Sequence, residues 1–180
     1  MKENEIKKST EEVAEEALGK IGVQKGQKVL DFGCGSGNYT MPAAKIVGKE
    51  GVVYALDKDK NVLDGLVEKA ESLGLRNIRR IDGETKTGLD DESVDVILIY
   101  DVLHEYYFPQ VNDRREALDE IYRIAKPDGL ISIYPTHIET EKLKSEIESA
   151  NFSIKSKYSG TLVLHGKLEE GRLLNFGKGV

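Results

Sequence analysis

The chain has 180 residues, 39% of them hydrophobic and 32% charged, and its 32 acidic residues against 26 basic ones give a net charge of −6. This length is enough for one domain with its own hydrophobic core, while the acidic balance argues against a nucleic-acid partner, which needs a basic face. No apolar segment approaches the roughly 20 residues of a membrane-spanning helix, and the charged start lacks the apolar core of a secretion signal, so we expect a cytoplasmic protein without a membrane span.

The first half of the chain alternates helix-patterned segments with short apolar runs. Ser9 and Glu12 have the spacing of a capping box and precede apolar residues at helical intervals, which predicts a helix from Ser9 to Ile21 after a loose arm at residues 1–8. The elements expected next are strands at 29–32 and 52–56, each followed by a helix, at 38–47 and 59–73, and then a weaker strand at 77–81.

The second half repeats the alternation and then departs from it. The near-continuous apolar run 94–100 is typical of a strand buried on both faces of a parallel sheet. Residues 152–158 and 161–165 flank Ser159 and Gly160, which predicts two strands joined as a hairpin. The other expected elements are a helix at 114–125, a turn at 126–129, a strand at 130–134, a helix at 139–150 and a loose tail at 166–180.

Strand and helix alternate five times before this hairpin. Such an order predicts an α/β fold in three layers, with a mostly parallel sheet between helices and an antiparallel strand at its end. No internal repeat and no linker divides the chain, so we expect residues 1–180 to form one domain.

A glycine-rich turn, from Asp31 to Asn38, follows the first strand, at the place where open parallel sheets bind ligands. Its three glycines permit positive φ angles and close approach of a ligand, and the helix behind it offers N–H groups to an anion. Asp57 ends the second strand, where a carboxylate can accept hydrogen bonds from both ribose hydroxyls of a nucleoside.

The charge of this turn indicates which nucleoside it suits. Neither Gly33 nor Gly35 begins a complete Gly-x-Gly-x-x-Gly dinucleotide fingerprint. Asp31 would repel a pyrophosphate by roughly several kcal/mol, but it would attract a sulfonium and an ammonium group. S-adenosylmethionine has these charges, with its cationic end suited to Asp31 and its carboxylate to the helix N-terminus near Gly37.

The segment from Val29 to Gly37 resembles motif I of the class I S-adenosylmethionine-dependent methyltransferases, and the resemblance extends over roughly residues 10–165. Residues 55–57 resemble the ribose-binding motif of that family, and 81–84 its adenine-binding segment; the small-molecule enzymes of quinone biosynthesis are the branch it resembles most. The resemblance implies a seven-stranded sheet with its last strand reversed, S-adenosylmethionine as cofactor, S-adenosylhomocysteine as product and a small-molecule acceptor. The cofactor-binding residues that it implies are Asp31, Gly33, Cys34, Gly35, Gly37, Asp57, Lys58, Asp82, Gly83 and Tyr100.

Some of these positions have a second interpretation. Lys58 stands where the family has an apolar residue against adenine, so only its methylene stem suits that place. Cys34 is a small residue between glycines, with a nucleophilic thiol as the alternative. As the single cysteine it forms no internal disulfide and no thiolate metal centre, and we expect no metal.

Three further residues are candidates for the acceptor side of the site. Tyr39 and Tyr106 are the candidate substrate residues; the alternative for Tyr39 is packing against the first helix, and for Tyr106 a place at the hydrophobic edge of the core. His104 is the candidate catalytic base, because it titrates near neutral pH and follows the strand 94–100. The alternative for His104 is a structural hydrogen bond that caps the strand.

Methyl transfer to a small molecule by in-line displacement is the function that this pattern favours, and most of the catalysis would come from holding the reacting atoms collinear. A cofactor-binding subunit or regulator without activity of its own is one alternative, and an RNA or protein methyltransferase is another. The sequence leaves open the identity of the acceptor and the oligomeric state, a homo-oligomer included.

Overall fold

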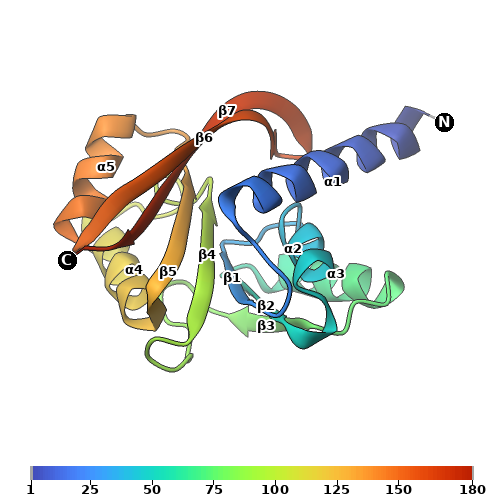
Figure 1. The fold of residues 1–180 in the computed structure, drawn as a ribbon, viewed down its shortest axis with the longest axis horizontal. Helices are drawn as coiled ribbons and strands as arrows, with labels where there is room; N and C mark the ends of the chain where they lie inside the picture. The colour runs from blue at the N-terminus through green and yellow to red at the C-terminus, as the bar shows by residue number, and fades with distance from the viewer. Residues whose placement is uncertain (1, 180) are drawn as a thin grey trace.

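The computed structural model describes residues 2–179, with side chains from residue 10 onward. These residues form one seven-stranded sheet with helices on both faces, the α/β architecture expected (Figure 1). The strands are β1 (Lys28–Phe32), β2 (Val52–Asp57), β3 (Ile78–Asp82), β4 (Val94–Tyr100), β5 (Ala125–Tyr134), β6 (Phe152–Leu164) and β7 (Lys167–Lys178). The helices are α1 (Lys2–Ile21), α2 (Thr40–Val47), α3 (Lys60–Ser72), α4 (Val111–Ile124) and α5 (Thr140–Ser149), with a 3-10 turn η1 (Gly48–Glu50) after α2.

The strand order is β3-β2-β1-β4-β5-β7-β6. β1 pairs in parallel with both β2 and β4, so the chain first builds the sheet outward on one side of β1 and then on the other. The crevice between the carboxyl ends of β1 and β4 is therefore the switch point at which such sheets bind ligands. β7 runs antiparallel to its neighbours β5 and β6, which confirms the predicted reversed strand.

The alternation of side chains along each strand divides the core between the two faces of the sheet. Val29, Val53 and Val96 pack with apolar residues of α1 and α2. Leu30 and Ile97, one position along, pack with residues of α4 and α5 on the opposite face. Both faces are apolar because helices cover both, as the continuous apolar run of β4 predicted.

The C-terminal hairpin differs from the prediction in its extent. β6 runs without interruption through Ser159 and Gly160, and the turn lies at His165 and Gly166 instead. The prediction of a loose tail at 166–180 is wrong, because residues 167–178 form β7 and pair with β5 as well as β6. Leu173, Leu174 and Phe176 of this strand are buried, and that burial stabilises a segment whose glycines suggested a coil.

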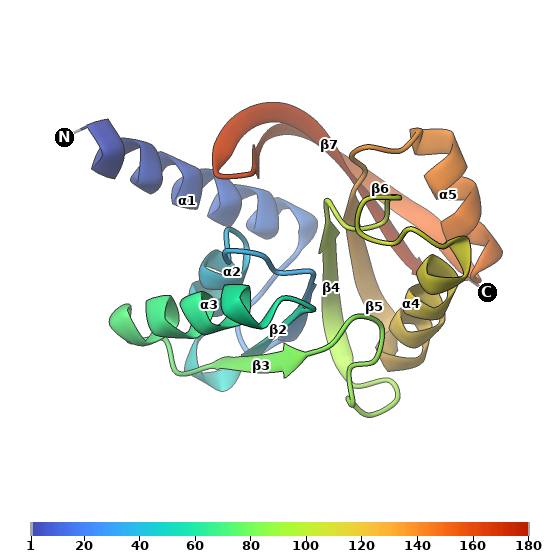
Figure 2. The same cartoon turned by 180° about the vertical axis from the view of Figure 1, so that it is seen from behind.

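The long β6–β7 hairpin bends away from the sheet and crosses toward α1 (Figures 1 and 2). Leu162 and Val163, near its tip, are buried in the same cluster as Ala14 and Leu18 of α1. The hairpin tip therefore lies over the N-terminal half of the sheet, far from the strand edge where the hairpin starts. This placement brings residues near position 165 to the switch point.

Two smaller differences concern element ends. α1 begins at Lys2, so the expected loose arm at 1–8 is helical from its second residue; Met1 lies outside the described residues. The predicted turn 126–129 is a bulge inside β5, because Ala125 pairs with Val94 while Leu130 pairs with Val96. Between residues 2 and 179, every helix is too short or too polar to cross a bilayer.

Candidate functional site

A cavity of about 260 Å³ lies at the carboxyl ends of β1, β2 and β4. The residues that line it are Asp31, Gly33, Cys34, Gly35, Ser36, Asn38, Tyr39, Asp57, Tyr100, Asp101, Tyr107, Val163, Leu164 and His165. Most of the residues expected to bind a cofactor are therefore brought together at the switch point. A second cavity, of about 540 Å³, adjoins the same turn at Ser36, Gly37 and Asn38.

The three glycines of the turn have φ angles of +77°, +51° and +83°, a region that favours glycine. A Cβ atom on Gly33 would lie 2.4 Å from Cγ2 of Val102, so no larger residue fits there without movement. A Cβ atom on Gly35 would meet nothing within 4 Å. The backbone at Gly35 therefore faces open space that a ligand can fill.

Asp31 is a buried carboxylate at the end of β1. The hydroxyl of Thr40, the first residue of α2, donates a hydrogen bond to its Oδ2 atom at 2.6 Å. Burial raises the pKa of Asp31 to about 6; the Thr40 hydrogen bond lowers it, and the negative charge of Asp57 raises it further. A cation that enters this cavity would meet a carboxylate with no basic partner among these contacts.

Asp57, also buried, connects the glycine turn to the loop after β2. Its Oδ2 accepts a hydrogen bond from the Gly35 N–H at 3.0 Å, and its Oδ1 accepts one from the Asp59 N–H at 3.0 Å. These two bonds fix the orientation of the carboxylate. Each oxygen keeps a second lone pair that can accept a hydrogen bond from a ligand hydroxyl.

Tyr107 closes one side of the cavity. Its hydroxyl is buried and has no hydrogen-bond partner among residues 10–179, and burial raises its pKa above the usual range. Lys58 holds it in place: Nζ donates to the Tyr107 carbonyl oxygen at 2.7 Å, lies 4.2 Å from the ring centroid and pairs with Glu84. Tyr107 belongs to the aromatic segment between β4 and α4, and it reaches the cavity because the fold brings that loop beside the ends of β1 and β2.

Lys58, Asp82 and Gly83 do not line this cavity, so their contact with a cofactor stays a prediction. The guanidinium of Arg80 holds the Asp82 carboxylate, with Nε 3.0 Å from Oδ1, and this hydrogen bond lowers the pKa of Asp82. Gly83 donates its N–H to the Asp57 carbonyl oxygen at 3.1 Å, so the two strand ends are joined. A role for Asp82 at an adenine ring stays a prediction.

Tyr39 and Tyr100 line the cavity with their rings in edge-to-face contact, 4.6 Å between centroids. The Tyr39 hydroxyl accepts a hydrogen bond from the Val163 N–H at 2.9 Å, and burial raises its pKa to about 12. The Tyr100 hydroxyl lies 2.9 Å from that of Ser132. Tyr106 is 81% exposed and does not line the cavity, so its role toward a substrate stays a prediction.

Cys34 lines the cavity, and its side chain is buried near the carboxylates of Asp31 and Asp57. Burial, and then the negative charges of Asp31 and Asp57, raise the pKa of its thiol above the usual range. A thiol that stays protonated is a poor nucleophile. The environment of Cys34 therefore favours its interpretation as a small residue between glycines.

Asp101, directly after β4, gathers histidines around its carboxylate. The Nε2 atoms of His104, His137 and His165 lie 3.3, 3.7 and 3.2 Å from its oxygens, and these are all the histidines in the chain. The Thr136 hydroxyl also donates to Oδ1. His104 is the expected member of this group; Asp101 precedes it by three residues, while His137 and His165 come from two other segments that meet it only in the folded chain.

Both ring nitrogens of His104 are engaged. Nδ1 accepts a hydrogen bond from the Tyr107 N–H at 3.3 Å, which leaves the proton on Nε2, 3.0 Å from the Asp101 carbonyl oxygen. This arrangement favours a positioning role for His104 beside Asp101. Its role as a catalytic base stays a prediction.

The sequence of this chain is similar to those of known methyltransferases. A family model described as a methyltransferase domain matches residues 23–178. A demethylmenaquinone methyltransferase of Staphylococcus epidermidis is 31% identical over 150 residues, which cover 83% of this chain and 59% of that protein. A probable cobalt-precorrin-6B C(15)-methyltransferase (decarboxylating) of Saccharolobus solfataricus is 40% identical over 101 residues, which cover 54% of this chain and 51% of that protein.

A solved structure gives a likeness over almost the whole chain. The crystal structure of a SAM-dependent methyltransferase from Aquifex aeolicus has a TM-score of 0.74 and 27% identity, and the match covers 93% of this chain and 89% of that one. The chain spans 59% and 51% of the length of the two curated relatives named above.

Proposed function

We propose a function for this chain from the premise that it belongs to the methyltransferase domain family. The proposed reaction is the transfer of a methyl group from S-adenosylmethionine to a small-molecule acceptor. The observation that carries the proposal is the pair of buried carboxylates, Asp31 and Asp57, on either side of the open glycine turn.

The residues of the cavity fit this cofactor in charge and in hydrogen-bonding capacity. Asp31 offers a buried negative charge to a sulfonium or ammonium group, and Asp57 offers free lone pairs to ribose hydroxyls. The open space at Gly35 is a further feature that a bound ligand would fill. Lys58 would contribute its methylene stem, since its amino group is engaged with Tyr107.

The cofactor, when bound, supplies a methyl group on a positively charged sulfur. The chain contributes position and environment: Asp31 would provide the compensating charge, and Tyr39, Tyr100 and Val163 line the cavity with apolar surface. With the leaving group already activated, alignment of the acceptor supplies most of the catalysis. A general base is needed only for an acceptor that keeps its proton at neutral pH, and His104 remains the candidate.

The relatives support an acceptor of low molecular mass. By their names, they act on demethylmenaquinone and on cobalt-precorrin-6B, which are both small molecules. The net charge of −6 adds to this support, because an RNA substrate requires a basic surface. The cytoplasmic location and a homo-oligomer stay predictions.

Replacement of Asp57 tests the proposal. Asp57→Ala removes the acceptor of the ribose hydrogen bonds, so we expect calorimetric affinity for S-adenosylhomocysteine to fall by about 1.5–3 kcal/mol, roughly ten- to hundredfold. The exposed loop residue Asp90, changed to Ala, is the matched control and is expected to bind like the wild type. Unchanged affinity in Asp57→Ala would exclude Asp57 from the site.

A turnover assay separates the proposed enzyme from a regulator. Panels of phenol, thiol and amine acceptors are incubated with S-adenosylmethionine, and formation of S-adenosylhomocysteine is measured. An enzyme releases it only when a suitable acceptor is present. Tight cofactor binding without turnover on small molecules, RNA or protein would favour the cofactor-binding subunit.

A further inference from the structure

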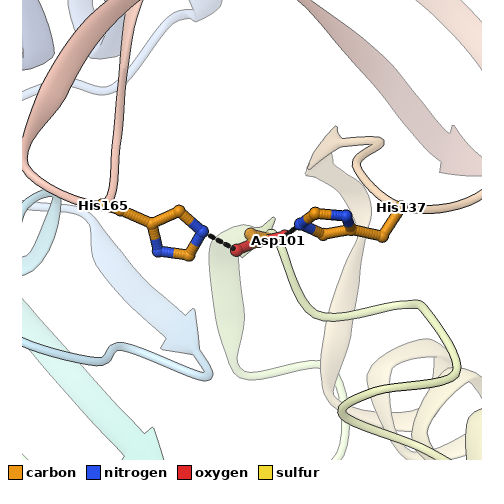
Figure 3. A group of neighbouring side chains, drawn as sticks. All are labelled: Asp101, His137 and His165. Carbon is orange, nitrogen blue, oxygen red and sulfur yellow. Dashed lines mark ion pairs between the residues drawn. The ribbon is translucent and has the colours of Figure 1, made fainter.

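The cluster at Asp101 has more donor atoms than the proposed reaction uses. His137 and His165 approach the carboxylate of Asp101 from opposite sides (Figure 3). One ligand atom from each of the three residues lies within 4.8 Å of the other two. Two imidazoles and a carboxylate are a donor set typical of metal centres.

The three residues come from three segments that meet only in the folded chain. Asp101 follows β4, His137 lies between β5 and α5, and His165 forms the tip of the β6–β7 hairpin. Their φ angles are +60°, +56° and +49°, and they are three of five non-glycine residues with positive φ in the described chain. Left-handed backbone at residues other than glycine persists where the surrounding structure requires it, and it concentrates at functional sites.

Neighbouring residues hold the carboxylate in place. The Thr136 hydroxyl donates to Oδ1 of Asp101, and Nε2 of His104 lies 3.3 Å from the same oxygen. The ring centroids of His104 and His137 also lie 5.3 Å apart. Such outer contacts to the ligands are the arrangement found around metal centres, where they orient the donor atoms.

We propose that Asp101, His137 and His165 bind a divalent first-row transition ion, with Zn²⁺ as the best fit. In a tetrahedral zinc site with bonds of about 2.0–2.1 Å, neighbouring donor atoms lie about 3.3 Å apart. Nε2 of His165 lies 3.2 Å from Oδ2 of Asp101 and Nε2 of His137 lies 3.7 Å from Oδ1, so each imidazole is near this separation from one of the two carboxylate oxygens. Three protein ligands leave a fourth position open, as in catalytic zinc sites.

The position of the ion gives it a role that rests on the proposed function. Asp101 and His165 line the same cavity as Asp31 and Gly35, so the open coordination position adjoins the proposed cofactor site. The ligand class for that position is an acceptor with an ionisable oxygen, such as a phenol or an enol, because these oxygens bind zinc as anions. The ion would also join the hairpin tip to the ends of β4 and β5.

A chelator competition experiment tests the site without any cofactor or acceptor. The full chain is stripped with EDTA, dialysed and titrated with ZnCl₂ in the presence of a chromophoric chelator. We expect one ion bound per chain. Titration with CoCl₂ in parallel should give the visible absorption bands of cobalt in a four-coordinate site.

Variants of the ligands assign the binding to these residues. We expect Asp101→Asn, His137→Ala and His165→Gln each to weaken Zn²⁺ binding by more than the roughly 10–100-fold that loss of an outer contact costs. His165 is 68% exposed at a hairpin tip, so its variant should fold like the wild type, which circular dichroism checks. Asp90→Asn, in an exposed loop, is the matched control.

Absence of zinc binding by the wild type, or equal affinity in the wild type and His165→Gln, would overturn the metal site and leave an ion-paired cluster in its place. Titration of the same stripped protein with S-adenosylhomocysteine separates this outcome from the proposed function. Cofactor binding without zinc binding rejects the metal site alone. Zinc binding without cofactor binding keeps the metal site and rejects the cofactor site.

Discussion

Among single residues, Asp31 has the environment most sensitive to pH. The folded chain raises its pKa from 3.8 to about 6, mainly through burial. The folded state therefore binds this proton more tightly than the unfolded state, and Asp31 lowers stability as pH rises from about 4 to about 6. A bound cation has the opposite effect on this pKa. It attracts the ionised carboxylate and therefore lowers the pKa of Asp31.

Cofactor affinity should therefore rise with pH through the titration of Asp31. We expect calorimetric affinity for S-adenosylmethionine to increase between pH 5 and pH 7, with a midpoint near the pKa of about 6. Thr40→Val removes the hydrogen bond that lowers this pKa and should move the midpoint upward. If the affinity of the wild type did not change with pH, or if Asp31→Asn had the same pH profile as the wild type, Asp31 would not interact with the cationic group of the cofactor.

The glycines of the turn offer a matched pair of substitutions. Gly33→Ala places a methyl group 2.4 Å from Val102 and should cost roughly 1–3 kcal/mol of folding stability through overpacking. Both glycines have a positive φ angle, so each variant also carries backbone strain of about 1–2 kcal/mol. Gly35→Ala has that strain without a clash, but its methyl group fills the space at the cavity. Thermal unfolding and cofactor titration should rank the two in opposite orders. Cofactor affinity in Gly35→Ala that matches the wild type would mean that Gly35 does not contact the ligand.

Among the elements, the β6–β7 hairpin decides which residues meet at the site. Its tip carries Val163, Leu164 and His165 into the cavity. The Val163 N–H donates a hydrogen bond to the Tyr39 hydroxyl, which ties this tip to the start of α2. The packing of Leu162 and Val163 with residues of α1 also holds the tip, so the two contributions can be separated by substitution.

Tyr39→Phe tests that connection. The substitution keeps the ring and removes the hydrogen-bond acceptor of a buried N–H, which should cost about 1–3 kcal/mol of stability. We expect faster hydrogen exchange in peptides that cover residues 160–166, with exchange in β4 unchanged. Exchange at the tip that matches the wild type would show that the packing of Leu162 and Leu173 holds the hairpin without this bond.

The hairpin also shows where sequence patterns fail. The four strands β1 to β4 lie within one residue of their predicted ends. For β1, β2 and β4 the reason is burial on both faces, which leaves an apolar run in the sequence; β3, at the sheet edge, has two arginines and gave the weaker signal. β7 has glycines and charges along much of its length and is stabilised by pairing with β5, a contact between distant segments. No local pattern contains that information.

At the scale of the whole molecule, the strand order places the site. The change in strand order between β1 and β4 brings the glycine turn, Asp57 and Asp101 to one edge of the sheet. The order of the motifs predicted this place for the glycine turn and for Asp57. The family was recognisable from residues 29–37 because contiguous residues form the turn. The histidine cluster could not be predicted in this way, since its members meet only through the crossing of the hairpin.

The central claim is that the cavity at this switch point binds S-adenosylmethionine. Calorimetric titration of the wild type with S-adenosylmethionine, and separately with NAD, tests it most directly. We predict saturable binding of one S-adenosylmethionine per chain and no binding of NAD. Saturable binding of NAD, with no affinity for S-adenosylmethionine or S-adenosylhomocysteine, would contradict the account.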